Sequence, residues 1–140
     1  MITLLKLSEN YDAMLGSDEI LFIHLGHCLT YGKVSYCTDV AVASRPDYVL
    51  LVLGNVDSVC YLCHVEDYDY SKDPRSVNQL NPHFGECSPA KFKDTPRKTW
   101  FLFDSMQRIP TSFAGQLSSR HSKNLIDAFI KSRANHKTLL

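Results

Sequence analysis

The sequence predicts an α+β fold: a small curled antiparallel or mixed β-sheet, or a barrel, with a short N-terminal helix and an amphipathic C-terminal helix. Three observations lead to this class. The chain has 140 residues, 44% hydrophobic and 21% charged, which is ordinary composition for one globular domain. Short runs of strand-forming residues recur along most of the chain, and helical spacing of apolar residues is clear only near the end. We therefore expect a single domain over residues 1–140.

The first third of the chain predicts three strands and one short helix. Residues 1–7 predict a strand, since they lack the basic region and the small-residue cleavage site of a signal peptide. A capping hydroxyl and early acidic residues predict a helix near 9–15. Residues 19–25 form a short and largely apolar run and predict a buried strand. The alternation over 33–42 predicts a half-buried strand.

The middle of the chain predicts a hairpin followed by a long loop. Residues 48–53 and 59–65 are both rich in β-forming residues, and the connection between them contains glycine and asparagine, which favour hairpin turns. The polar, proline-containing stretch at about 66–98 predicts a long irregular loop. Such loops are often functional. Residues 99–103 then predict another strand.

A C-terminal helix is predicted near 119–135. Leu125, Ile126, Phe129 and Ile130 recur at helical spacing, and charged residues occupy the other faces. Sequential antiparallel strands with a helix packed on them fit a curled sheet or a barrel.

The cysteine content predicts a reduced, cytoplasmic protein. There are five cysteines, and an odd number in a chain without an export signal argues against a disulfide framework. No apolar run approaches the roughly 20 residues that cross a bilayer. We expect buried thiols and no membrane association.

Charge is distributed unevenly although the net charge is zero. Residues 1–90 carry five basic and twelve acidic side chains, whereas residues 91–140 carry ten basic and three acidic ones. Such asymmetry is typical of a surface for a polyanion. The alternative is that the two halves neutralise each other within one fold.

The basic third therefore contains the candidate nucleic-acid-binding residues. Cations alternate with aromatic rings over 91–101, and further cations open the predicted C-terminal helix. Trp100 is the candidate for stacking on a base, and the cations would hold phosphates. The predicted phosphate-binding residues are Lys91, Lys93, Arg97, Lys98, Arg120 and Lys123. Alternatively, Trp100 belongs to the core and the cations are solvated.

A zinc site is one alternative. Cysteine and histidine ligands at the spacing of Cys60, Cys63, His83 and Cys87 have the right chemistry for zinc, and the metal would fix the long loop. Otherwise no cofactor is expected. Buried thiols are the competing interpretation.

A protein partner is the other alternative. The acidic segment formed by Glu66, Asp67, Asp69 and Asp73 would engage a basic partner, as expected of a small inhibitor or an accessory factor. The sequence contains no glycine-rich phosphate loop, nucleophile elbow or HExxH motif, so no catalytic residue is assigned.

Three segments resemble the PUA-like superfamily, in particular its EVE-type domains. These are residues 17–24, residues 47–53 with the hairpin that follows, and residues 88–101 with their tryptophan. The resemblance implies a small barrel with peripheral helices that binds DNA or RNA without chemistry of its own. It also implies an aromatic pocket at the mouth of the barrel for a modified or flipped base. The candidates for its walls, by strand position, are His24, Tyr61 and Trp100.

Overall fold

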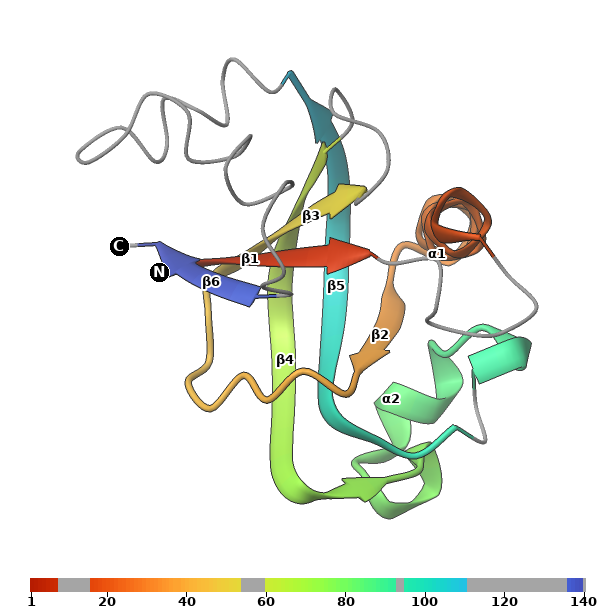
Figure 1. The fold of residues 1–140 in the computed structure, drawn as a ribbon. Coiled ribbons are helices and arrows are strands. Elements are labelled where there is room, and N and C mark those ends of the chain that lie inside the picture. The colour runs from red at the N-terminus through yellow and green to blue at the C-terminus, as the bar shows by residue number, and fades with distance from the viewer. Residues whose placement is uncertain (8–15, 54–59, 93–94, 111–135, 140) are drawn as a thin grey trace.

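The fold is built on one mixed sheet of six strands. Figure 1 shows the computed structural model, which describes residues 1–7, 16–53, 60–92, 95–110 and 136–139. In chain order the strands are β1 (Ile2–Leu7), β2 (Val34–Thr38), β3 (Tyr48–Leu53), β4 (Cys60–Arg75), β5 (Arg97–Ile109) and β6 (His136–Leu139). Their order across the sheet is β2-β5-β4-β3-β1-β6. β1 and β3 are parallel and all other neighbours are antiparallel.

The α+β class and the mixed sheet are thus confirmed, and the described strands form an open sheet rather than a closed barrel. The predicted strands at 1–7, 48–53, 59–65 and 99–103 are all present. The predicted helices near 9–15 and 119–135, and the hairpin connection at 54–58, lie outside the described residues. β6 follows the segment 119–135 along the chain, and no pattern in the sequence predicted it.

The run 19–25 is helical, so the prediction of a strand there was wrong. It belongs to α1, a helix from Ser17 to Tyr31. Asp18 and Glu19 in its first turn suit the positive end of the helix dipole. At its end Gly32 adopts φ 81° and its N–H donates to the Cys28 carbonyl, a left-handed cap that glycine favours. The apolar run was ambiguous because α1 carries apolar residues on more than one face.

The region 66–98 is ordered, so the prediction of a long irregular loop was also wrong. β4 continues to Arg75, and β5 begins at Arg97. Between them lie a 3-10 turn at Val77–Gln79, the short helix α2 at Pro82–Glu86 and a second 3-10 turn at Ala90–Phe92. Proline at the start of α2 favours this turn, because its missing N–H has no partner to lose there.

The core lies on both faces of the sheet. Leu5, Leu51 and Phe101 belong to a cluster that also contains Ile20 and other residues of α1. Their strand neighbours point the opposite way. Leu4, Leu50 and Cys60 form a second cluster, and Trp100, Leu102 and Phe84 form a third.

β2 is buried along its whole length rather than half-buried as predicted. Tyr36 packs in the cluster shared with α1, while Cys37 packs with Phe84 of α2 on the other face. The alternating pattern therefore did not predict which side chains of β2 are exposed, because both faces of the strand are covered. All five cysteines are free, as expected. Within the described ranges, no helix has the length and apolar character needed to cross a membrane.

Candidate nucleic-acid interface

The end of the β4–β5 hairpin gathers four basic side chains from two separate segments of sequence. Arg75 lies opposite Arg97 in the register of the two strands, and Tyr70 lies opposite Thr99. The pairing is irregular between Tyr70 and Arg75, and this irregular stretch carries Lys72. A shift in register redirects side chains. Lys72, Arg75, Arg97 and Lys98 therefore share one end of the sheet.

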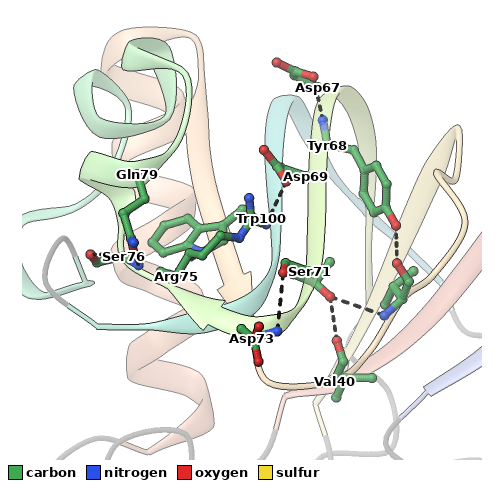
Figure 2. A network of polar contacts seen from close by, with 12 residues as sticks. Val40, Asp67, Tyr68, Asp69, Ser71, Asp73, Arg75, Ser76, Gln79 and Trp100 are labelled. Atoms are coloured by element: carbon green, nitrogen blue, oxygen red, sulfur yellow. Dashed lines mark hydrogen bonds and ion pairs between the residues drawn. The ribbon is translucent and has the colours of Figure 1, made fainter.

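A buried tryptophan supports this end. Trp100 is fully buried, and its indole N–H donates to the Arg75 carbonyl at 3.0 Å. Figure 2 shows the Trp100 ring beside Arg75 and Asp69. The Arg75 Nη2 lies 2.6 Å from Asp69 Oδ1. Neither Nη2 nor Nε of Arg75 makes a hydrogen bond of good geometry among the described residues, so charge attraction holds this pair.

Side-chain contacts to the segment after β2 fix the start of β5. The Thr99 hydroxyl donates to the Val40 carbonyl at 2.7 Å and accepts from the Val42 N–H at 3.2 Å. The Tyr68 hydroxyl donates to the Val42 carbonyl; Figure 2 shows Tyr68 and Val40 on the same side of the hairpin. Arg97 lies 3.8 Å from Asp39 of this segment. The basic end of the hairpin is thus held from two sides.

The acidic side chains of β4 are paired within the chain. Glu66 lies 2.7 Å from Lys33, and this hydrogen bond raises the pKa of Lys33 above its ordinary value. Asp67 accepts from His83, and Asp69 pairs with Arg75. Among the four acidic candidates, only the exposed Asp73 has no ion pair within the described residues.

Three lysines, two of them at this end of the hairpin, keep their charge free. Lys72 and Lys91 are exposed and Lys98 is half-exposed. None of the three has a hydrogen bond or an ion pair within the described part of the chain. Lys91 lies on the 3-10 turn that precedes β5. Of the remaining predicted phosphate-binding residues, Lys93, Arg120 and Lys123 lie outside the described residues.

Trp100 cannot take the stacking role predicted for it. It packs against Phe84 and Leu102 with no exposed surface, so a base cannot reach its ring. The prediction failed because a strand-borne tryptophan beside cations looks the same in sequence whether it faces solvent or the core. Tyr70, which is half-buried and opposite Thr99, is an aromatic side chain at this end that retains exposed surface.

The predicted pocket of His24, Tyr61 and Trp100 is not formed. His24 lies on α1 rather than on a strand, Tyr61 packs in the α1-side cluster, and Trp100 belongs to the cluster on the opposite face. All three are buried. The three side chains therefore do not line one cavity.

His24 is a neutral core histidine. It is 1% exposed, its Nδ1 donates to the Ile20 carbonyl at 2.7 Å, and its Nε2 has no hydrogen-bond partner within the described residues. Its ring centroid lies 4.8 Å from that of Phe92 and 5.2 Å from that of Tyr36. Burial lowers the pKa of His24 to about 4, because the charged imidazolium would be desolvated.

The four predicted zinc ligands do not converge. Cys60 and Cys63 point to opposite faces of the sheet and lie in different core clusters, as expected of positions three apart on a strand. His83 pairs with Asp67, and burial raises the pKa of Cys63 well above its ordinary value. No group of three or more candidate metal-ligating side chains forms within the described ranges. This arrangement does not fit a zinc site.

Three residues of the interface were not predicted from sequence. Tyr70, Lys72 and Arg75 all fall within the loop expected at 66–98. The alternation of Asp67 and Asp69 with Tyr68 and Tyr70 is the signal that a strand continued past residue 65.

No family model, curated protein or solved structure matches this chain. The fold and the side-chain arrangement are therefore the only guides to its function.

Proposed function

We propose that this chain is a nucleic-acid-binding module without catalysis of its own, and that the end of the β4–β5 hairpin contacts the phosphate backbone. One observation supports the proposal most strongly: Lys72, Lys91 and Lys98 have no acidic partner within the described residues, whereas the neighbouring acids Glu66 and Asp69 are paired. Free lysines on a rigid support are suited to phosphates.

Tyr70 adds a surface for an unpaired base. It lies at the same end of the hairpin as Lys98 and Lys72 and is half-exposed. Stacking on an aromatic ring contributes about 1–3 kcal/mol per base and tolerates any sequence. We therefore expect single strands of DNA or RNA to bind more tightly than duplexes of the same length.

The alternative of a protein partner that binds the acidic segment has less support. Glu66, Asp67 and Asp69 already have partners in the chain. A basic partner would first have to displace these contacts, which would cost part of the affinity gained.

The test is fluorescence anisotropy with labelled single-stranded RNA, single-stranded DNA and duplex DNA over a range of salt concentrations. Each phosphate contact contributes a slope of about −0.7 in log K against log salt for a single strand. Three lysine contacts predict a slope near −2, by that estimate. Absence of binding to all three probes, or binding that does not depend on salt, would remove the proposal.

A matched pair of variants locates the contact on one strand. Lys98 and Arg108 both lie on β5, near its start and its end respectively, and neither has an ion pair within the described residues. Lys98→Gln should weaken binding about three- to tenfold and make the salt slope shallower by about one contact. Arg108→Gln removes the same charge and should leave both the affinity and the slope nearly unchanged.

A further inference from the structure

The outer face of α1 is an exposed apolar surface. No Asp, Glu, Lys or Arg occurs between Glu19 and Lys33. Phe22 is 63% exposed and Leu29 is 76% exposed. These positions share one face of the helix with the exposed Gly26, because residues spaced by three, four or seven align.

The opposite face of α1 is already used by the core. Ile20 and His24 are buried against the sheet, as is Cys28. A helix that is apolar on both sides is usually covered on both sides. Large exposed apolar side chains grouped on one element are a common sign of an interaction surface.

Gly26 gives this face a gap at its centre. A Cβ added at Gly26 would meet no atom within 4 Å, so no packing inside the chain requires a glycine there. Glycine in a helix interior costs about 1 kcal/mol relative to alanine. A glycine lets another backbone approach the helix closely.

The charges that flank the face are arranged symmetrically about Gly26. Glu19 precedes it by seven residues and Lys33 follows it by seven. Two copies of α1, antiparallel and crossing at Gly26, would therefore bring Glu19 in the first turn of each helix toward Lys33, which follows the Gly32 cap at the end of the other helix. The helix dipoles would also be opposed. This self-complementarity is what a two-fold interface requires, since one patch must match itself.

The available carboxylate and ammonium groups suit such pairs. Glu19 is exposed and has no ion pair within the described ranges. The Lys33 side chain is 46% exposed while it contacts Glu66, so its ammonium can reach a second carboxylate. An anionic lipid surface fits less well, because the helix lacks the row of cations that such surfaces attract.

We propose that the face of α1 formed by Phe22, Gly26 and Leu29 binds a second copy of this chain, with the two helices antiparallel and crossing at Gly26. The contact is one helix of 15 residues on each side, or about 22 Å. That is small beside the roughly 800 Å² per partner of a standard interface. The dimer should therefore be weak, with a Kd on the order of micromolar.

Sedimentation equilibrium over a wide range of protein concentration measures this association. The wild-type chain should change reversibly from monomer to dimer. Phe22→Glu and Leu29→Glu should each weaken association at least about tenfold, because they bury a charge at the crossing. Tyr48→Glu is the matched control: Tyr48 is 38% exposed and lies on β3, so this variant should dimerise like the wild type.

A charge exchange tests the antiparallel arrangement. One variant is Glu19→Lys. The other is Lys33→Glu together with Glu66→Lys, which keeps the pair inside the chain with its signs reversed. Each variant alone should self-associate about three- to tenfold more weakly than the wild type. An equimolar mixture should form heterodimers with near wild-type affinity, since only unlike copies then place opposite charges together.

Three outcomes would overturn the proposal. In the first, the wild type remains a monomer up to its solubility limit. In the second, Phe22→Glu and Leu29→Glu dimerise as tightly as the wild type. Alternatively, the exchanged variants could fail to recover association on mixing. Binding of the wild-type monomer to lipid vesicles through this face would assign the surface to a different partner.

Discussion

The acidic segment of β4 and three lysines of the same region of the sequence differ in how their charges are satisfied. Glu66, Asp67 and Asp69 each have a partner within the chain. Lys72, Lys91 and Lys98 have none within the described residues. In sequence the acidic segment is the more conspicuous of the two.

This difference shows that a charged segment is informative about partners only once its internal pairs are known. Acids that are paired internally contribute little to the field that an incoming ligand meets, whereas unpaired lysines contribute fully. The proposed nucleic-acid interface is therefore compatible with a strongly acidic stretch of sequence beside it.

The largest expected effect is on the free energy of unfolding and comes from Trp100, which packs beneath the basic end and beside the acidic segment. Trp100 is paired in register with Asp69 and donates to the Arg75 carbonyl. Trp100→Ala should lower the free energy of unfolding by about 3–5 kcal/mol, because it leaves a large cavity. Trp100→Phe keeps most of the packing and should cost less. Urea unfolding measures both. A Trp100→Ala variant as stable as the wild type would show that the basic end does not depend on this side chain.

The next expected effect is a loss of stability at low pH that arises from the buried core and not from the surface ion pairs. The pKa of His24 is about 4 in the folded chain, below its ordinary value of 6.5. The unfolded chain therefore takes up the proton first as pH falls. Stability should be complete above pH 6.5 and should decline by about 3 kcal/mol between pH 6.5 and pH 4.

His24→Phe should remove this contribution to the pH dependence of unfolding. His27→Gln is the matched control, because His27 lies on the same helix but keeps exposed surface. This variant should keep most of the loss of stability at low pH, because burial is the largest cause of the low pKa of His24. If the wild type lost no stability over this range, the assignment of His24 as a buried neutral group would be wrong.

The smallest expected effect comes from removing the acidic partner of one cation, Arg75. Asp69→Asn removes the carboxylate that faces Arg75. It should cost about 1–2 kcal/mol, because the Arg75 Nη2 that faces this carboxylate is buried and loses its charge partner. It should also strengthen nucleic-acid binding about two- to threefold, because the basic end gains net positive charge.

Asp73→Asn is the control for this change. Asp73 is exposed and has no ion pair in the described part of the chain. Its replacement should raise affinity by a similar or smaller factor without loss of stability. Anisotropy titrations and urea unfolding on the same samples compare the two. Weaker binding by Asp69→Asn would imply that the acid, rather than the arginine, faces the ligand.

The sequence predicted the strands whose β-forming composition is bounded by turn residues and failed where two interpretations shared one pattern. Residues 48–53 became β3, a run of Val and Leu that is followed in sequence by the turn-forming pair Gly-Asn. Residues 19–25 became part of a helix, since an apolar run does not reveal its period. The sequence did not predict the extended β4 because a polar, acidic segment is also typical of a loop, although acidic and tyrosine residues alternate there through Tyr70.

The candidate site was only partly predictable, for a related reason. Lys91 and Lys98 could be named from charge and position alone. The stacking role of Trp100 and the zinc ligands could not be judged from sequence, because each depended on which face a strand residue occupies. The internal partners of Glu66 and Asp69 come from distant segments or from a register irregularity, and neither can be read from spacing.

The most direct measurement of the central claim is a map of amide chemical shifts as a single-stranded oligonucleotide is added. The largest changes should occur at Lys72, Lys91, Lys98 and Tyr70, with little change along α1 or around Glu66. Changes concentrated on α1 or on the acidic residues of β4, with none at the end of the β4–β5 hairpin, would contradict it.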